Sequence, residues 1–336
     1  MHQVRTSWEE IQLGNADTLY IVVPCYKEQE VLPETSRRLK EKLKSLIEKG
    51  KIGAGSRILF VNDGSKDETW PIISRLHERE PDVFSGVNLS RNRGHQNALL
   101  AGLSTAVTRA DIVISMDADL QDDINAVDAM IDAYHNGFDV VYGVRSKRES
   151  DTFFKRFTAE GFYKVMQALG VDIVFNHADY RLMSRRALEA LMEFGEVNLF
   201  LRGIVPQVGF PSTTVTYERA ERFAGESKYP LKKMIAFAAD GITSFSVKPI
   251  RLVLFAGIFI FLCSLIMFIY AVITKFAGRS TSGWSSLMAS IWMLGGIQLL
   301  ALGIVGEYIG KIYNETKRRP RFIIESVLDS NGEKNG

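Results

Sequence analysis

Two long apolar runs constrain this chain more than any other feature. The first extends over residues 252–274 and the second over residues 284–305, and neither contains a charged residue. A helix rises about 1.5 Å per residue, so each run can cross the hydrocarbon core of a bilayer, which is about 30 Å thick. The linker of residues 275–283 is too short to hold a domain. We therefore predict a membrane-spanning helical hairpin over residues 251–310; the alternative is a pair of buried core helices.

The flanks of this predicted hairpin are more basic than the loop inside it. The flanking basic residues are Lys232, Lys233, Lys248 and Arg251 before the hairpin, and Lys311, Lys317, Arg318, Arg319 and Arg321 after it. Positive charge marks the cytoplasmic side of a membrane. We expect a multi-pass protein of the plasma (inner) membrane, with the N-terminal domain and both termini in the cytoplasm. Residues 231–250 are predicted to form an amphipathic juxtamembrane helix or a plain buried helix, and residues 311–336 a basic tail that suits anionic head groups.

The overall composition excludes several classes of protein. A 46% share of hydrophobic residues, with only 9 Pro and 2 Cys, excludes a disordered chain, a collagen-like fibre and a disulfide scaffold. The formal net charge is +2, so no field of the whole protein favours nucleic acid as a partner. The N-terminal residues are polar and lack the apolar core of a secretory signal.

Residues 1–230 alternate between strand-like and helix-like segments. Near-continuous apolar strands separated by helical periods predict a doubly wound, mostly parallel α/β sheet that helices cover on both faces. The predicted strands are residues 18–24, 57–63, 86–90, 111–117 and 139–143, and the helices between them are residues 30–49, 68–79, 97–107 and 125–136. Ligands of such sheets bind outside the carboxyl ends of the strands.

Polar residues follow four of these strands, and the most informative are acidic. Asp117 and Asp119 are separated by one residue where a strand ends, a spacing that can turn both carboxylates toward one hard cation, with the amide oxygen of Gln121 in reach. Oxygen ligands of this kind suit Mg²⁺ or Mn²⁺, and a cation with two carboxylates can complete its shell with diphosphate oxygens and water. The alternative is a solvated acidic turn. Asp63, after another strand, is either a site residue or a turn residue.

Several motifs together resemble family 2 glycosyltransferases that act on polyprenyl phosphate. The resemblance is closest to bactoprenol glucosyltransferases and more distant to dolichol-phosphate mannose synthases, and it covers roughly residues 18–323. The motifs are VVPCYKE, FVNDGSKDET, LSRNRGHQNALLAGL, MDADLQ, DYRLMSR (residues 179–185), GESKYPLKKM (residues 225–234) and IQLLALGIVGEYIGKIYNETKRRP.

This resemblance implies a GT-A fold for residues 1–230 and assigns a role to several strand-end residues. The implied nucleotide-binding residues are Pro24, Tyr26, Glu28, Asp63 and Asp117, and the implied metal ligands are Asp117, Asp119 and Gln121. Replacement of Asp119 is expected to abolish turnover. The sequence departs from the family at residues 122–123, where a second Asp leaves the metal loop more flexible or merely more acidic, and at Arg93, where an aromatic residue is common.

The acceptor phosphate requires cationic side chains between the sheet and the hairpin. The candidates are Arg181, Arg202, Arg222 and Lys228, because guanidinium and ammonium groups bind phosphate oxygens; the alternative for each is a solvated surface charge. Asp179 is a candidate catalytic residue that orients the acceptor or acts as a base, and the alternative is a buried partner of Arg181 or Arg185.

The predicted reaction is the inverting transfer of a hexose from a UDP-sugar to undecaprenyl phosphate. A phosphate monoester has a second pKa of about 6, so the acceptor is largely ionised at neutral pH and can attack the anomeric carbon without a strong base. The resemblance favours glucose, and N-acetylglucosamine or another sugar stays open. A non-catalytic lipid-binding scaffold is the alternative from another class of protein. Glycines in the second apolar run suit either hairpin packing or a homo-oligomer.

Overall fold

The computed structural model describes residues 16–146, 177–196, 201–218, 248–276 and 283–329. The chain divides into two compact units. The first comprises Met1–Thr152, Val174–Lys228 and Pro320–Gly336, and the second comprises Phe153–Ile173 and Tyr229–Arg319. Each unit is considered by itself.

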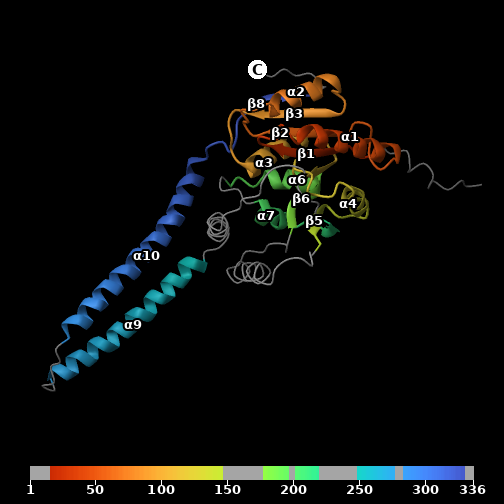
Figure 1. Ribbon diagram of the computed structural model, residues 1–336. Helices are drawn as coiled ribbons and strands as arrows, with labels where there is room; N and C mark the ends of the chain where they lie inside the picture. Colours follow the sequence, from red (N-terminus) through yellow and green to blue (C-terminus); the bar gives the residue numbers. More distant parts are fainter. Residues whose placement is uncertain (1–15, 147–176, 197–200, 219–247, 277–282, 330–336) are drawn as a thin grey trace, which may run out of the picture. The chain divides into compact units, whose positions relative to one another are not determined.

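The first unit is built on one sheet, which has eight strands in the described residues. The order of the strands across it is β7-β5-β6-β4-β1-β2-β3-β8 (Figure 1). The strands are β1 (Leu19–Cys25), β2 (Arg57–Asn62), β3 (Phe84–Leu89), β4 (Ile112–Ser115), β5 (Val140–Arg145), β6 (His177–Ser184), β7 (Ser212–Tyr217) and β8 (Ile324–Leu328). β1 is parallel to β2 and β4, β2 to β3, and β5 to β7. β6 is antiparallel to both of its neighbours, and β8 is antiparallel to β3. The predicted doubly wound, mostly parallel sheet is confirmed.

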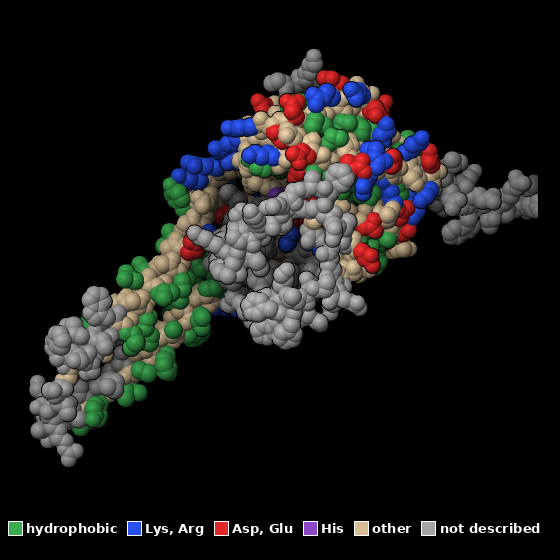
Figure 2. Space-filling view, in the orientation of Figure 1, with side chains coloured by type: hydrophobic (Ala, Val, Ile, Leu, Met, Phe, Trp, Pro, Cys, Tyr) green, Lys and Arg blue, Asp and Glu red, His purple; other side chains and the backbone are tan. Residues whose placement is uncertain are grey.

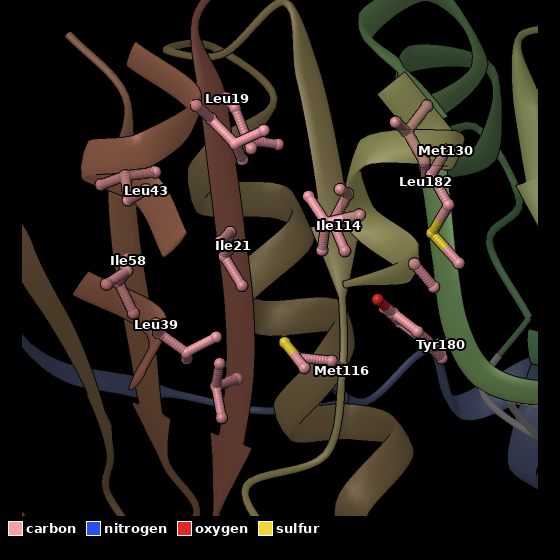
Figure 3. Close-up of a cluster of buried hydrophobic side chains, with 14 of the residues drawn as sticks. Leu19, Ile21, Leu39, Leu43, Ile58, Ile114, Met116, Met130, Tyr180 and Leu182 are labelled. Carbon is pink, nitrogen blue, oxygen red and sulfur yellow. The ribbon is translucent and has the colours of Figure 1, made fainter. Parts of the chain in front are cut away.

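Helices cover both faces of this sheet. They are α1 (Leu32–Glu48), α2 (Thr69–Arg79), α3 (His95–Ala106), α4 (Ala126–His135), α6 (Arg185–Met192), α7 (Leu201–Ile204) and the 3₁₀-helix η2 (Val205–Val208). Alternate side chains of β1, including Leu19 and Ile21, pack with Leu39 and Leu43 of α1 in the core of one face (Figure 3). On the other face α3 lies directly on the strands. A Cβ at Gly102 would come within 2.4 Å of a methyl carbon of Val22.

The five strands predicted from sequence correspond to β1–β5, and they are the buried ones. Every residue of β1 and β4 is buried, as expected for parallel strands covered on both faces. The sequence analysis did not include β6, β7 or β8. β7 is rich in Ser and Thr and alternates between exposed and partly buried positions, and β6 places the charged side chain of Arg181 in the interior, with 2% exposure.

The second unit contains two long helices, α9 (Lys248–Phe276) and α10 (Trp284–Lys317), which contact each other. Both predicted apolar runs are helical, and α10 continues past residue 305 to Lys317. Large apolar side chains along both helices are exposed, for example Phe259 at 68% and Leu299 at 73% (Figure 2). Among the described residues one stretch, Met293–Lys317, is long and apolar enough to cross a membrane. Most of the predicted juxtamembrane helix, residues 231–250, lies outside the described residues.

After the helical pair the chain returns to the sheet of the first unit. β8 pairs with β3 from Gly86↔Leu328 to Leu89↔Ile324, and the backbone N–H of Ser90 donates to the carbonyl of Ile323 at 3.0 Å. An ion pair of 2.7 Å joins Asp329 to Arg109 at the end of α3. Residues 320–329, part of the segment predicted as a basic tail, are therefore part of the first unit.

Candidate active site

The loops after the strands carry two backbone conformations that are uncommon for residues with a side chain. Lys27, after β1, has φ 58°, and Leu120, after β4, has φ 57°. Left-handed conformations of such residues persist where the surrounding structure holds them, and they cluster at functional sites. Both lie at the sheet edge where the sequence predicts ligand binding.

The loop after β4 presents the two predicted metal ligands in different hydrogen-bonding environments. One carboxylate oxygen of Asp119 accepts the backbone N–H of Gln121 at 3.1 Å. The carboxylate of Asp117 lies 3.6 Å from Nε2 of His95. Burial raises the pKa of Asp117 to about 6; His95 opposes this shift, while Asp122, Asp179 and Asp119 add to it. A divalent cation would relieve this crowding of negative charge, so the donor set of Asp117, Asp119 and Gln121 fits Mg²⁺ or Mn²⁺.

No group of three or more His, Cys, Asp or Glu side chains within the described ranges is arranged to hold a metal ion by itself. The predicted site differs from such a cage because it combines two carboxylates with an amide.

Asp122, the first residue of the Asp122-Asp123 pair at which the sequence departs from the family, anchors the loop after β4. Its side chain is 1% exposed, and the hydroxyl of Tyr217 donates to its carboxylate at 2.5 Å. Arg145 donates to the Tyr217 oxygen at 3.2 Å and lies 3.7 Å from Asp122. The hydroxyl of Tyr180 donates to the backbone carbonyl of Asp123 at 3.0 Å. Side chains from strands β5, β6 and β7 therefore contact this loop.

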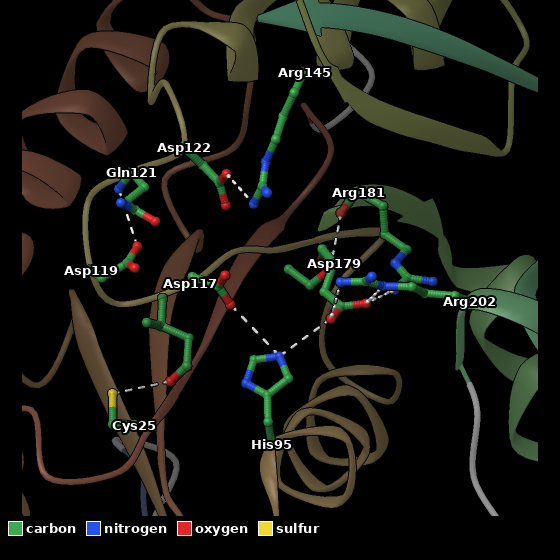
Figure 4. A network of polar contacts seen from close by, with 12 residues as sticks. Cys25, His95, Asp117, Asp119, Gln121, Asp122, Arg145, Asp179, Arg181 and Arg202 are labelled. Carbon is green, nitrogen blue, oxygen red and sulfur yellow. Dashed lines mark hydrogen bonds and ion pairs between the residues drawn. The ribbon is translucent and has the colours of Figure 1, made fainter. Parts of the chain in front are cut away.

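A second cluster surrounds Asp179 on β6. Arg181 donates to its carboxylate at 2.7 Å, Arg202 lies at 3.3 Å and Nε2 of His95 at 3.5 Å. The same ring nitrogen of His95 faces both Asp117 and Asp179, as Figure 4 shows. His95 therefore joins the two clusters.

The surroundings of Asp179 keep its carboxylate ionised. Burial alone would raise its pKa, but the contact with His95 and the charges of Arg202 and Arg181 outweigh burial and hold the pKa well below its usual range. A carboxylate of such low pKa is a weak base. Asp179 pairs with Arg181, as the alternative of a buried partner predicts, whereas Arg185 pairs with Asp111 at 3.0 Å.

Two of the four predicted acceptor cations lie in this cluster. Arg181 is buried, and its Nε and Nη1 have no hydrogen-bond partner among the described residues. Buried donors of this kind are costly unless a ligand or another group satisfies them. Arg202 lies on the other side of Asp179. Arg222 and Lys228 fall outside the described residues.

A cavity of about 530 Å³ lies at the ends of β1, β2 and β3. It combines two aromatic rings, several cations and several amide or hydroxyl groups, which suits a nucleoside with attached phosphates. The lining residues are Tyr26, Lys27, Asn62, Gly64, Ser65, Lys66, Trp70, Asn88, Leu89, Ser90, Arg91, Asn92 and Glu325. Of the predicted nucleotide-binding residues, Tyr26 lines this cavity.

The other predicted nucleotide-binding residues have structural contacts of their own. Asp63 accepts the backbone N–H groups of Arg93 and Gly94 at 2.6 and 2.9 Å, which ties the loop after β3 to the end of β2. The carbonyl of Glu28 begins α1 by accepting from residues 31 and 32, and Pro24 is a buried residue of β1. Gly64, at φ 61°, permits the two loops to touch, because a Cβ there would lie 2.4 Å from the backbone of Arg91.

Sequence reasoning did not select four residues that the structure places in this region. His95 follows directly on a strand-end loop, and its place in the LSRNRGHQ motif could have identified it. Asn62 is the last residue of β2 and Asn88 is the second-to-last residue of β3, where the strand-end rule also applies. Glu325 had no local signal, because it enters the site from beyond the helical pair.

The chain matches two known families. Residues 20–192 match the family described as Glycosyl transferase family 2, and residues 248–312 match the family described as GtrB C-terminal hairpin. These two segments correspond to the sheet unit up to α6 and to the helical pair.

Relatives match the chain over most of its length. An uncharacterized glycosyltransferase, YkoT, of Bacillus subtilis (strain 168) is 54% identical, with 92% of this chain and 92% of that protein covered. The bactoprenol glucosyl transferase of Shigella phage SfX is 40% identical, with 91% of this chain and 98% of that protein covered. A prophage bactoprenol glucosyl transferase homolog of Escherichia coli (strain K12) is 39% identical, with 91% and 98% covered.

Proposed function

Because the chain belongs to glycosyltransferase family 2 and its sheet unit has the GT-A fold, we propose that it transfers glucose from UDP-glucose to undecaprenyl phosphate. One observation carries the proposal. Nε2 of His95 lies 3.6 Å from Asp117 and 3.5 Å from Asp179. One imidazole ring therefore lies between Asp117, a candidate metal ligand, and Asp179, the centre of the arginine cluster. With the donor diphosphate near Asp117 and the acceptor phosphate near Asp179, the anomeric carbon and the attacking phosphate oxygen would lie side by side.

The donor binds along the strand ends. The nucleoside occupies the cavity of about 530 Å³ between Tyr26 and Trp70, and the diphosphate extends toward the loop after β4. Asp117, Asp119 and Gln121 would hold Mg²⁺ or Mn²⁺, which stabilises the charge on the leaving diphosphate. Asp122 and Tyr217 keep that loop in position.

The acceptor phosphate binds to Arg181 and Arg202, and the unsatisfied N–H groups of Arg181 supply donors for its oxygens. An ionised phosphate oxygen attacks the anomeric carbon, the new C–O bond forms as the bond to the diphosphate breaks, and the configuration inverts. Asp179 holds both arginines in position. Its low pKa suits this role better than that of a base.

The helical pair anchors the enzyme beside its lipid acceptor. The exposed apolar side chains of α9 and α10 suit a bilayer, and the basic residues at both flanks support a sheet unit on the cytoplasmic face. The enzyme is in this proposal a multi-pass protein of the plasma membrane. Glycines in α10 are compatible with a homo-oligomer.

The test is formation of the glycolipid by the purified full-length protein. We expect radioactive glucose to move from UDP-glucose into the lipid phase with Mg²⁺ and undecaprenyl phosphate, and mass spectrometry to show a polyprenyl-phosphate hexose. Parallel reactions with UDP-N-acetylglucosamine decide the sugar. A scaffold would bind the lipid without forming a product from any donor, and that result would refute the proposal.

The matched variants separate the metal site from general damage. Asp119→Ala should reduce turnover by about a thousandfold, as expected for the loss of a group that organises transition-state charge. Asp82→Asn is the control, because the Asp82 side chain is 90% exposed and the residue precedes β3, whereas the predicted site acids follow the ends of strands. An Asp119→Ala protein with normal turnover would contradict the metal role.

A further inference from the structure

β8 brings an acidic side chain to the cavity from beyond the helical pair. Glu325 lines the cavity together with Asn62 and Asn88. An acidic residue on an edge strand often has no role except to keep the edge solvated and prevent sheet extension. Its hydrogen bonds distinguish Glu325 from that case.

A row of hydrogen bonds connects Glu325 to the end of β2. The side-chain amide of Asn88 donates to Oε2 of Glu325 at 2.9 Å, and the amide of Asn62 donates to Oδ1 of Asn88 at 2.7 Å. The backbone N–H of Ser65 then donates to Oδ1 of Asn62 at 3.2 Å. All four residues line the cavity.

The two ends of the row fix its direction together, because the backbone N–H of Ser65 can only donate and the carboxylate of Glu325 is the acceptor at the other end. An ionised carboxylate can only accept hydrogen bonds, so Asn88 must turn its NH₂ group toward Glu325 and its oxygen toward Asn62. Asn62 must in turn direct its NH₂ group to Asn88 and its oxygen to Ser65. Each NH₂ group has a second N–H for a ligand, and Glu325 has a second oxygen. The row therefore presents donors and an acceptor in a fixed order.

The position of β8 is itself fixed at both ends. The Ser90 to Ile323 hydrogen bond holds its start, and the ion pair of Arg109 with Asp329, whose side chain is 9% exposed, holds the residue after its end. Between them Leu328 packs against the hydrophobic core. Glu325 is thus placed by folded structure on both sides.

We propose that Glu325 is a specificity-determining residue of the donor site, which orders the amides of Asn88 and Asn62 and accepts a hydrogen bond from the nucleoside of the donor. The proposal rests on the proposed function in taking the cavity as the nucleotide site. The group that donates to Glu325 is either an N–H of the base or a hydroxyl of the ribose. Both present the same chemistry to a carboxylate.

Binding of UDP to the full-length protein tests this, measured by isothermal titration calorimetry in detergent with Mg²⁺. We expect Glu325→Ala to weaken UDP binding by about tenfold, the effect of losing one hydrogen bond to a charged group, and Glu325→Gln to weaken it less. The control Glu78→Gln, an exposed residue of α2, should bind like the parent protein. In turnover assays Glu325→Ala should raise the KM for the donor and leave kcat unchanged.

Two analogues identify the group that Glu325 recognises. If it binds the base, N3-methyl-UDP binds weakly to the parent protein, and Glu325→Ala removes the discrimination against it. If it binds the ribose, 2′-deoxy-UDP shows that behaviour. Equal discrimination by the parent and the variant against both analogues would overturn the proposal.

Other outcomes separate this inference from the proposed function. If UDP binding depends on Glu325 but no glycolipid forms, the inference stands and the proposed function fails. If glycolipid forms and Glu325→Ala binds UDP normally, the inference fails alone. If Glu325→Ala loses UDP binding and also melts at a clearly lower temperature than the parent protein, the residue has a structural role. That result would also overturn the inference.

Discussion

The two sides of the candidate site use opposite kinds of polar contact. On β2, β3 and β8, neutral amides form a row that ends in one carboxylate. Around β4 and β6, carboxylates, arginines and a histidine contact one another directly. Neutral hydrogen bonds distinguish the shape and donor pattern of a ligand, whereas buried charges act where charge moves during a reaction. The amide row therefore suits recognition, and the charged cluster suits chemistry.

The charged cluster should be the side on which a substitution costs most. Arg181→Met removes the guanidinium beside Asp179 and leaves a buried carboxylate with fewer partners. We expect the free energy of unfolding to fall by about 3–5 kcal/mol, measured by urea denaturation of the purified protein. The double variant Arg181→Met with Asp179→Asn should regain part of that loss. A single variant as stable as the parent would remove the energetic contrast between the two sides.

The anchor of the metal loop should give a smaller effect. Tyr217→Phe deletes the hydroxyl that donates to buried Asp122, so the free energy of unfolding should fall by about 1–3 kcal/mol. The loop would also hold Mg²⁺ less well, so half-maximal activity should require more Mg²⁺. Tyr134→Phe on α4, outside this network, is the control. An unchanged Mg²⁺ requirement would show that the anchor stabilises the fold without serving the metal.

In the amide row of β2, β3 and β8 we expect a substitution to change the affinity for the donor and to leave kcat unchanged. Asn88→Asp replaces the donor to Glu325 with a second carboxylate, and the two like charges should raise the KM for the donor by about tenfold while kcat at saturating donor stays the same. Asn136→Asp, at an exposed position after α4, introduces the same charge elsewhere. A fall in kcat with an unchanged KM would place the amide row on the chemical side of the comparison.

The smallest effect should come from the ion pair of buried Asp139 with exposed Arg186, which belongs to neither side. The hydrogen bond from Arg186 lowers the pKa of Asp139 against the opposing effect of burial, and Ser184 adds to the lowering. A carboxyl pKa below its unfolded value of about 3.9 stabilises the fold above that pH, and the contribution is lost as the pH falls through the folded value. Asp139→Asn should thus melt at a lower temperature than the parent at pH 7, with a difference that narrows below about pH 4. A constant difference would contradict this origin.

The sequence predicts the elements that follow from local patterns of residues, and it does not predict contacts between segments that are distant in the chain. Strands β1–β5 follow from continuous apolar segments, and Asp117 and Asp119 follow from the rule that ligands bind beyond strand ends. In β6 the pair of Asp179 and Arg181 could be anticipated from their spacing, but the strand could not, because these charged residues interrupt the continuous apolar pattern by which β1–β5 are recognised.

Long-range pairing accounts for the rest of the site. Glu325 and Asn88 are 237 residues apart in sequence, and nothing in either segment specifies the other. The resemblance implies a nucleotide contact for Asp63, and the structure adds a contact that its place after a strand does not predict, because the loop whose N–H groups it accepts lies 30 residues away. The LSRNRGHQ motif alone does not predict the contact of His95 with Asp179, because only the folded sheet places Asp179 on β6 beside it.

The return of β8 to the sheet imposes an order on biosynthesis. Residues 324–328 leave the ribosome after both long helices, so β3 keeps an unpaired edge throughout the time in which those helices are made. Open strand edges invite pairing with other chains. A nascent chain halted after Lys317 would carry its helical pair with an unprotected sheet edge and with a cavity that lacks Glu325, so both long helices are made before the cavity at the strand ends is complete.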